Sequence, residues 1–209
     1  MSTAESVKVV LLGDSGVGKS SLCLRFVTNQ FRPYSEATIG ASFMSKTVVV
    51  RGLSDDDDAV ARGERHVGFK IWDTAGQEKY RSLAPMYYRG SQAAILVYDI
   101  TKPGSFAALR DWADELRRNG PSDLVLAVCG NKSDLREDRL VDRRAGEEYA
   151  SSLGALYVET SAKDGDDVER LFVDVARRVP SRSHYEDEYL AEDGGLDLGK
   201  PDVQSKKCC

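Results

Sequence analysis

Residues 13–20 read GDSGVGKS, which fits the pattern G-x-x-x-x-G-K-S/T of a phosphate-binding loop. A continuously apolar run at 7–12 precedes the loop, and residues with helical spacing follow at 19–27. The pattern requires a strand before the loop and a helix after it, and the sequence predicts both. The stretch therefore indicates an α/β fold in which a nucleotide phosphate lies at the start of a helix.

The alternation of apolar runs and helical segments continues along the chain. The further predicted strands are 43–50, 67–71, 93–98, 124–129 and 156–158, and the further predicted helices are 105–118, 143–153 and 168–179. Most of these strands are continuously apolar, which is typical of parallel strands that helices cover on both faces. The strands 43–50 and 67–71 are expected to face each other across a polar connection. We therefore expect an α/β fold of the P-loop NTPase class, with a mostly parallel six-stranded sheet and helices on both faces.

Two segments of the chain are too polar to pack into a core. Residues 51–66 connect the two facing strands and carry four consecutive aspartates at 55–58, so we expect an extended polar hairpin loop. A metal site there is disfavoured, because adjacent aspartates in a flexible loop rarely converge on one ion. Residues 181–209 have few large apolar side chains and more acidic than basic ones. We predict one domain over 1–180 and a disordered, hypervariable tail over 181–209.

Composition excludes several classes of protein. The 209 residues carry 29 basic and 34 acidic side chains, a formal net charge of −5, which gives no reason to expect nucleic acid as a partner. The N-terminus shows no secretory signal, and no apolar run approaches the about 20 residues that span a bilayer. Cys23 and Cys129 lie in apolar stretches and the other two cysteines end the chain, so no disulfide framework is expected. We expect a cytosolic protein that contacts a membrane only through modification.

The phosphate-binding loop leads to predictions for the residues around the phosphates. Lys19 can reach the outer phosphates, and the Ser20 hydroxyl is placed to coordinate Mg²⁺. Thr38 is the natural second hydroxyl for that metal, and Asp73, at a strand end, suits support of Mg²⁺ through water. Gln77 has both an acceptor and a donor, which suits it to orient an attacking water, so we assign it the catalytic role. The expected phosphate-binding residues are Ser15, Gly16, Val17, Gly18, Lys19, Ser20, Ser21, Thr38 and Gly76.

Residues 131–134 read NKSD, follow a predicted strand, and decide between nucleotides. Ligands bind at the carboxyl ends of the strands in such sheets. The Asp134 carboxylate can accept from both guanine N1–H and the exocyclic amine, a donor pair that adenine lacks, so it favours guanine strongly. A weaker signal follows the next strand at 161–163, where backbone N–H groups can meet guanine O6. The guanine-binding residues expected from these motifs are Asn131, Lys132, Asp134, Ser161, Ala162 and Lys163.

In order and in spacing, these motifs resemble the Ras superfamily of small GTPases. The sequences that resemble the Rab family within it are WDTAGQE at 72–78, YRSL at 80–83 and YYRG at 87–90. TIGASF at 38–43, together with APMYY at 84–88, is similar to the early-endosomal Rab group. The resemblance covers roughly residues 7–179. It implies a Ras-like G domain that binds GTP or GDP with Mg²⁺.

The resemblance also implies roles for single residues. Phe31 would pack on the guanine face, and Phe43, Trp72 and Tyr87 would form an aromatic triad on the surface that binds effectors. The residue types alone leave the triad equally open to core or hairpin packing. The two segments that carry the second metal hydroxyl and the catalytic glutamine would be switches, ordered by the γ-phosphate and loosened after hydrolysis.

Two cysteines, Cys208 and Cys209, end the chain after two lysines. This ending does not fit the C-a-a-X pattern, but paired terminal cysteines resemble the double-geranylgeranylation site of Rab proteins. Two prenyl chains anchor a protein stably where one is marginal. The resemblance therefore implies attachment to the cytoplasmic face of membranes, with the early endosome as the expected location and a soluble cytosolic pool.

The leading hypothesis is a switch that hydrolyses GTP and recruits effectors in vesicle and endosomal traffic when GTP is bound. No arginine in the switches is obviously placed to complete the transition state, so intrinsic hydrolysis should be slow and depend on an activating protein. The implied partners are an exchange factor, a GTPase-activating protein, a GDP-dissociation inhibitor, a prenylation escort and effectors. Two alternatives remain: a nucleotide-stabilised scaffold without a hydrolysis cycle, and a P-loop kinase or ATPase, which Asp134 opposes.

Overall fold

The computed structural model describes residues 4–34, 36–51 and 64–180 of the chain. Met1–Val179 forms one compact unit, and a second unit, Pro180–Cys209, is described only at its first residue. The expected tail at 181–209, the four aspartates at 55–58 and both terminal cysteines lie outside the described residues. The predictions of a disordered tail and of lipidation therefore stay predictions.

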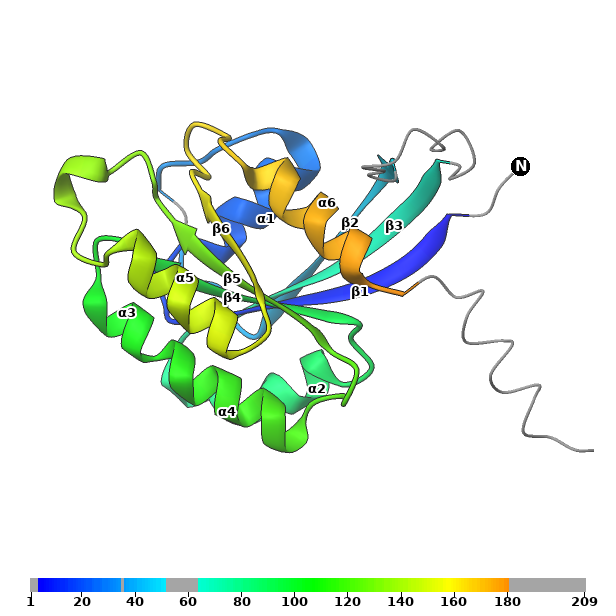
Figure 1. Ribbon diagram of the computed structural model, residues 1–209, viewed down its shortest axis with the longest axis horizontal. Coiled ribbons are helices and arrows are strands. Elements are labelled where there is room, and N and C mark those ends of the chain that lie inside the picture. Colours follow the sequence, from blue (N-terminus) through cyan, green and yellow to red (C-terminus); the bar gives the residue numbers. More distant parts are fainter. Residues whose placement is uncertain (1–3, 35, 52–63, 181–209) are drawn as a thin grey trace, which may run out of the picture. The chain divides into compact units, whose positions relative to one another are not determined.

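Six strands form a single sheet in the order β2-β3-β1-β4-β5-β6 (Figure 1). β2 runs antiparallel to β3, and every other neighbouring pair is parallel. The strands are β1 (Glu5–Leu12), β2 (Ala41–Val50), β3 (Arg65–Thr74), β4 (Ala93–Asp99), β5 (Val125–Asn131) and β6 (Leu156–Thr160). This confirms the predicted α/β fold with a mostly parallel six-stranded sheet.

Helices cover both faces of the sheet, as predicted (Figure 1). Helices α1 and α6 contribute to the buried cluster on one face, and α2, α3, α4 and α5 to the cluster on the other. The helices are α1 (Lys19–Thr28), α2 (Ala84–Tyr88), α3 (Pro103–Ala107), α4 (Leu109–Asn119), α5 (Arg143–Ser152) and α6 (Val168–Arg178), with 3₁₀ turns η2 (Glu78–Leu83) and η3 (Arg136–Asp138). Within the described ranges, each helix is too short or too polar to cross a membrane.

One predicted helix, 105–118, is two helices in the structure. The first begins earlier, at Pro103, because a proline at the first helical turn loses no hydrogen bond. The second begins at Leu109. Between them Ala108 has a ψ of −18°, and the hydrogen bond from Trp112 N to Ala108 O is stretched to 3.4 Å. This flattened turn interrupts the helix, and no residue type in the sequence signals it.

The expected hairpin loop at 51–66 is shorter than predicted, because β3 begins at Arg65. Arg65 and His66 continue the antiparallel ladder with the end of β2. The Arg65 Nη1 donates to the carbonyls of Ala176 and Val179, at the end of α6, at 2.9 and 3.0 Å. An arginine can satisfy helix-terminal carbonyls in this way. Arg65, which was predicted to lie in the loop, therefore binds the end of a helix.

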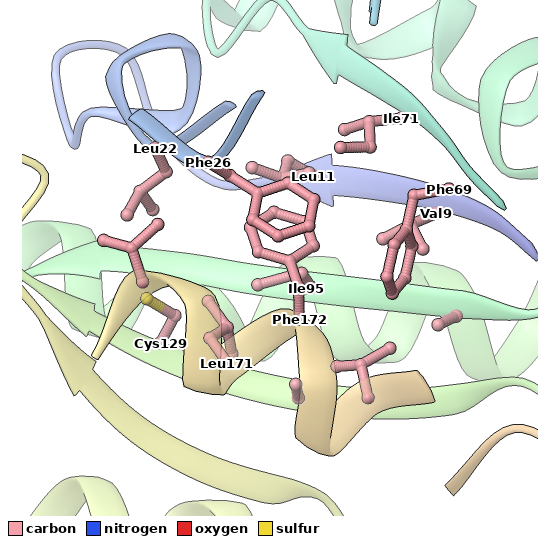
Figure 2. Close-up of a cluster of buried hydrophobic side chains, with 14 of the residues drawn as sticks. Val9, Leu11, Leu22, Phe26, Phe69, Ile71, Ile95, Cys129, Leu171 and Phe172 are labelled. Atoms are coloured by element: carbon pink, nitrogen blue, oxygen red, sulfur yellow. The ribbon is translucent and has the colours of Figure 1, made fainter. Parts of the chain in front are cut away.

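The larger buried cluster lies between the sheet and helices α1 and α6 (Figure 2). Three phenylalanines form its centre. Phe26 of α1 stacks on Phe172 of α6 with ring centroids 3.8 Å apart, and Phe69 of β3 meets these rings edge-on at 5.6 and 5.7 Å. Each such pair contributes about 0.5–1.5 kcal/mol beyond the area that it buries. This packing fixes α1, and thus its N-terminus, relative to the strands.

The strand directions bring the loops of the predicted site to one edge of the sheet. β1, β3, β4, β5 and β6 are parallel, so their carboxyl ends lie at the same edge. β2 runs the opposite way, and its first residue, Ala41, pairs with Thr74 at the end of β3. The segment before β2 therefore reaches the same edge, where open α/β sheets bind their ligands.

Candidate nucleotide-binding site

A cavity of about 600 Å³ opens at this edge of the sheet. Its volume falls in the range of about 300–1,000 Å³ that is typical of small-molecule sites. Most residues that the sequence analysis assigns to phosphates, metal and guanine line it: Ser15, Gly16, Gly18, Lys19, Ser20, Ser21, Phe31, Thr38, Gly76, Asn131, Lys132, Asp134, Ala162 and Lys163. Val17, Asp73 and Ser161 are buried and Gln77 is half-buried, and these residues do not line it.

The sequence analysis missed much of one side of the cavity. The segment between α1 and β2 contributes several residues beyond Phe31 and Thr38, and two more come from the end of β3 and from the residue after 131–134. The additional lining residues are Arg32, Pro33, Tyr34, Glu36, Ala37, Thr74 and Leu135. The signal for most of them was present, because they lie in the chain between two residues that were already assigned to the ligand.

The turn from β1 into α1 depends on glycine. Gly18 has a φ of 99°, which is left-handed, and a Cβ on it would lie 2.3 Å from Asn131 Nδ2. Only glycine satisfies both conditions. Helix α1 then starts at Lys19 with no described side chain capping it and no acidic residue in its first turn. Its first N–H groups and its positive dipole end are therefore available to an anion in the cavity.

Lys19 is almost fully buried although it lines the cavity. Its Nζ donates to Gly13 O at 2.6 Å and to Asp14 O at 2.7 Å. Burial lowers the pKa of Lys19 to about 8, against the attraction of Asp73 and Asp14, which raises it. Gly76 packs directly on this ammonium, because a Cβ there would lie 2.5 Å from Nζ. A phosphate beside Nζ would offset the cost of burying the charge, so this position favours an anion.

A group of hydroxyls surrounds a buried carboxylate beside the loop. Ser20 Oγ and Thr38 Oγ1 lie 2.7 Å apart, and Ser42 Oγ donates to Asp73 Oδ2 at 3.4 Å. Burial raises the pKa of Asp73, while Ser20, Lys19, Ser42 and Thr38 oppose the rise. Asp73 Oδ1 is buried and has no hydrogen-bond partner among the described residues.

These oxygen atoms fit a Mg²⁺ ion. Mg²⁺ takes oxygen ligands and keeps several of its waters, so two hydroxyls together with a carboxylate oxygen that can accept from a metal-bound water match its demands. The partnerless Asp73 Oδ1 is the observation that supports this fit. The sequence analysis did not predict a role for Ser42. The pairing of β2 with β3 places it directly opposite Asp73, so knowledge of the strand register would have revealed it.

Gln77 lies on the segment that follows β3. It comes directly after Gly76 and is half-buried. Its backbone carbonyl accepts from Tyr80 N at 3.0 Å, where the turn η2 begins. The predicted catalytic residue is thus next in the chain to a residue that packs on Lys19, but it is not part of the cavity wall.

Asn131 ties three loops together behind the cavity. Its Nδ2 donates to Val17 O at 2.8 Å. Its Oδ1 accepts from Thr160 Oγ1 at 3.2 Å and from Ala162 N at 3.3 Å. The residue was predicted to contact guanine, and the structure adds a second role, because its amide joins the phosphate-binding loop to both loops of the predicted guanine site.

Lys132 is held by a carboxylate that the sequence analysis did not single out. Its Nζ lies 2.6 Å from Asp99 Oδ2 and donates to Gly16 O at 3.0 Å. Burial raises the pKa of Asp99, but hydrogen bonds from Lys132 and Thr101 outweigh it and lower the pKa overall. The available signal was an aspartate that ends a continuously apolar strand, where ligands and site residues gather.

The Asp134 carboxylate is fixed by the neighbouring loop. Ser161 Oγ donates to Asp134 Oδ1 at 2.7 Å, and Ser161 Oγ itself accepts from Asp164 N at 3.0 Å. Lys163 Nζ lies 3.8 Å from Asp134 Oδ2. Phe31 is half-buried on the wall of the same cavity and packs against the larger buried cluster. A carboxylate, an aromatic face and a row of backbone groups therefore meet in one place, as recognition of a purine base requires.

The three predicted effector-surface residues lie together. Phe43 pairs with Trp72 across β2 and β3 with ring centroids 5.5 Å apart, and Tyr87 lies 5.7 Å from Trp72. Trp72 and Tyr87 pack against the second buried cluster, whereas Phe43 is 53% exposed. Ile39 and Met86, from the adjoining segments, are also strongly exposed. The aromatic group thus both packs on the core and presents an apolar surface.

Comparison with known proteins gives a consistent result. The sequence model described as the Ras family matches residues 8–181. The chain is 47% identical to the Ras-related protein Rab-31 of Rattus norvegicus over 210 residues, 100% of both chains. It is 48% identical to the Ras-related protein Rab-22A of Homo sapiens over 204 residues, 97% of each chain. It is 52% identical to Rab-22A of Canis lupus familiaris over 175 residues, 84% of each chain.

Proposed function

Because this chain belongs to the Ras family of small GTPases, in the group of its Rab-31 and Rab-22A relatives, we propose that it is a membrane-attached switch of endosomal traffic. It is a GTP hydrolase that alternates between a GTP-bound and a GDP-bound form. The GTP-bound form recruits effectors. The observation that carries the proposal is the single cavity that joins a phosphate-binding loop to Asp134.

Guanine binds between the loops at 131–134 and 161–163. The Asp134 carboxylate accepts from N1–H and from the exocyclic amine of the base. Phe31 packs on one face of the ring, and the backbone N–H groups of 161–163 meet O6. Adenine would leave the carboxylate unpaired in a partly buried place, which is costly.

In hydrolysis, the residues of the chain position a water against the γ-phosphate. Ser20 and Thr38 would hold Mg²⁺ directly and Asp73 would hold it through water, and the bound metal supplies charge that neutralises the phosphate oxygens. Lys19 donates to the outer phosphates. Gln77 orients the water, whose oxygen forms a bond to the γ-phosphorus as the bond to the β–γ bridging oxygen breaks. GDP and phosphate result.

Intrinsic hydrolysis is expected to be slow. Arg32 is the only arginine among the described residues of the cavity wall. It directly follows Phe31, which would contact the base, and it comes six residues before Thr38, which would hold the metal. An activating protein that adds a cation at the γ-phosphate would raise the rate by about 10³–10⁵. The further partners are an exchange factor, effectors, a GDP-dissociation inhibitor and a prenylation escort.

Membrane attachment rests on the end of the chain. Prenylation of Cys208 and Cys209 would anchor the protein to the cytoplasmic face, and residues 181–209 would act as a tether. The early endosome is the proposed location, because the sequences at 38–43 and 84–88 are similar to the early-endosomal Rab group. The exposed aromatic group of Phe43, Trp72 and Tyr87 is the proposed effector surface.

The bound nucleotide tests this proposal most directly. The protein is purified in Mg²⁺ and denatured, and the released nucleotide is identified by chromatography. Near-stoichiometric GDP or GTP is expected, whereas an empty protein or adenine nucleotide would contradict the guanine site. Nothing observed favours a scaffold without a hydrolysis cycle; such a scaffold would bind partners equally with GDP and with a non-hydrolysable GTP analogue.

A further inference from the structure

The contacts of Arg25 join the phosphate helix to the predicted guanine loop. Arg25 lies on α1 and does not line the cavity. Its Nε donates to Ala162 O at 2.8 Å, and its Nη2 donates to Lys163 O. The two carbonyls belong to successive peptide groups, so one planar guanidinium donates hydrogen bonds to both of them at once.

The first of these contacts sets the direction of an N–H group. No peptide bond in the described residues is cis, and in a trans peptide the C=O and the N–H point in opposite directions. The Ala162 carbonyl points to Arg25, which lies outside the cavity wall. The N–H of Lys163 belongs to the same peptide and is aimed away from Arg25. Ala162 and Lys163 line the cavity and Arg25 does not, so the side of this peptide opposite Arg25 is the one that can face the cavity.

The second contact acts on Asp134 through a chain of hydrogen bonds. The Lys163 carbonyl is held by Arg25, so the Asp164 N–H of the same peptide points the other way. It donates to Ser161 Oγ at 3.0 Å. Because Ser161 Oγ accepts there, its own proton is directed to Asp134 Oδ1, 2.7 Å away. Arg25, which lies outside the cavity, therefore positions both the Lys163 N–H donor and the Asp134 carboxylate acceptor.

The guanidinium is itself held in place. Its Nη1 donates to Asn29 O at 2.8 Å and to Asn29 Oδ1 at 3.3 Å. Asn29 ends α1 with a φ of 57°, and its N–H donates to Arg25 O. Asn29, at the end of α1, thus orients the guanidinium group of Arg25. Lysine cannot replace it, because an ammonium is a point charge without the two parallel donors.

We propose that Arg25 is a positioning residue for guanine recognition: it holds the carbonyls of Ala162 and Lys163 so that the Lys163 N–H meets guanine O6 and Asp134 meets the base donors. This rests on the proposed function, since it assumes a guanine nucleotide in the cavity. It adds a residue of α1, outside the cavity, to the determinants of base choice.

The test compares nucleotides that differ at the atom concerned. In 6-thio-GDP, sulfur replaces O6, and sulfur is a weak acceptor, whereas N1–H and the exocyclic amine remain. Competition binding in Mg²⁺ gives the preference for GDP over 6-thio-GDP in the wild type, in Arg25→Lys and in Arg25→Gln. Both variants are expected to lower that preference by about 3–10-fold, the worth of one hydrogen bond.

Arg65→Lys is the matched control. Arg65 also bonds to two backbone carbonyls at a helix end, but it lies at the start of β3, whereas the cavity lies at the carboxyl end of that strand. Its substitution is expected to lower the unfolding temperature and to leave the preference for GDP over 6-thio-GDP unchanged. A merely structural role of Arg25 would give the same result as this control.

The outcomes separate the inference from the function. A wild-type protein with no preference for GDP over ADP would overturn the proposed function. If the wild type prefers GDP and both Arg25 variants keep the wild-type ratio, only the inference is overturned. If neither variant folds, the amide resonance of Lys163 in the wild type decides: exchange of GDP for 6-thio-GDP should shift it, and an unmoved resonance overturns the inference.

Discussion

The two sides of the cavity hold their polar groups in different ways. The base side comprises residues 131–134 and 161–163, and the phosphate side comprises residues 13–20, Thr38 and residues 73–77. On the base side, other protein groups occupy polar side-chain atoms of Asn131, Lys132 and Asp134. On the phosphate side, several groups find a partner only among themselves or find none.

Most polar side chains of the base side are braced by other protein groups. The amide of Asn131 makes three hydrogen bonds to protein groups, and Lys132 is held by the buried Asp99. Ser161 fixes the Asp134 carboxylate. These contacts hold the polar side chains in one arrangement, so this half of the site is preformed.

The phosphate side has fewer bonds to the rest of the fold. Asp73 Oδ1 is buried without a partner among the described residues, and Ser20 and Thr38 bond to each other. In the adjoining segment Tyr34 is 97% exposed and Ile39 is 80% exposed. A metal and a γ-phosphate would complete this half. This contrast explains how a switch can change its surface and still keep its nucleotide. The fold would hold the base, whereas the γ-phosphate and the metal would order the segments that carry Thr38 and Gln77.

Asp134→Asn should break the base side with the largest effect. The amide has an NH₂ group in place of one carboxylate oxygen, so two donors face each other at N1–H or at the exocyclic amine of guanine. The preference for GDP over ADP is therefore expected to fall by about 10⁴-fold. The Ser161 contact can persist, so the unfolding temperature should change little. Competition binding measures the preference, with the exposed Asp138→Asn as control. A preference within tenfold of the wild type would show that another group selects the base.

Gln77→Leu should break the phosphate side without touching the base side. Hydrolysis stimulated by an activating protein is expected to fall by about 10³-fold, because no group then orients the water. GDP and GTP affinities should stay the same. Single-turnover phosphate release measures the first and competition binding the second, with the exposed Gln30→Leu as control. Stimulated hydrolysis at the wild-type rate would remove Gln77 from the catalytic role.

The same contrast explains what the sequence can predict. The phosphate-binding loop and the NKSD stretch are recognisable because each is a short run of residues whose chemistry is local. Ser42, Asp99 and Arg25 were missed because each acts on a residue that is distant in the chain, and the pairing exists only after the sheet has formed. The start of β3 at Arg65 was missed likewise, because its pairing with β2 and its bonds to the end of α6 are tertiary contacts. The break at Ala108 was missed because no residue type signals it.

Asp73→Asn should sharpen the description of the metal centre. An uncharged amide supports a metal-bound water less well, so the affinity for Mg²⁺ in the presence of GDP is expected to fall by about 10–100-fold. In excess EDTA the variant and the wild type should bind GDP alike. Calorimetric titration with Mg²⁺ measures the difference. An unchanged Mg²⁺ affinity would exclude Asp73 from the metal centre.

The smallest effect is expected from the ion pair between Arg139 and Glu159, and it concerns the free energy of unfolding. Arg139, which follows the NKSD stretch, donates through both Nη atoms to the carboxylate of Glu159 at 2.8 Å. Tyr157 also donates to that carboxylate, at 2.9 Å. Glu159 lies just before the 161–163 loop, so the pair links the two loops of the base side. Burial raises the pKa of Glu159, but Arg139 and Tyr157 outweigh it and lower the pKa overall.

Glu159→Gln tests this brace through pH. The folded-state pKa of Glu159 lies below the unfolded value of about 4.3, so its stabilisation is present above that pH and is lost as the pH falls through the folded pKa. The free energy of unfolding should be lower in the variant by about 1–2 kcal/mol at pH 7. The gap should be smaller at about pH 3.5, because the unfolded carboxyl is then mostly protonated. Urea unfolding at both pH values measures the difference.

Glu148→Gln is the control. It breaks an exposed pair with Arg144 and should lower the free energy of unfolding by less than about 0.5 kcal/mol. A gap of equal size at both pH values would mean that the shape of Glu159, and not its charge, braces the base side.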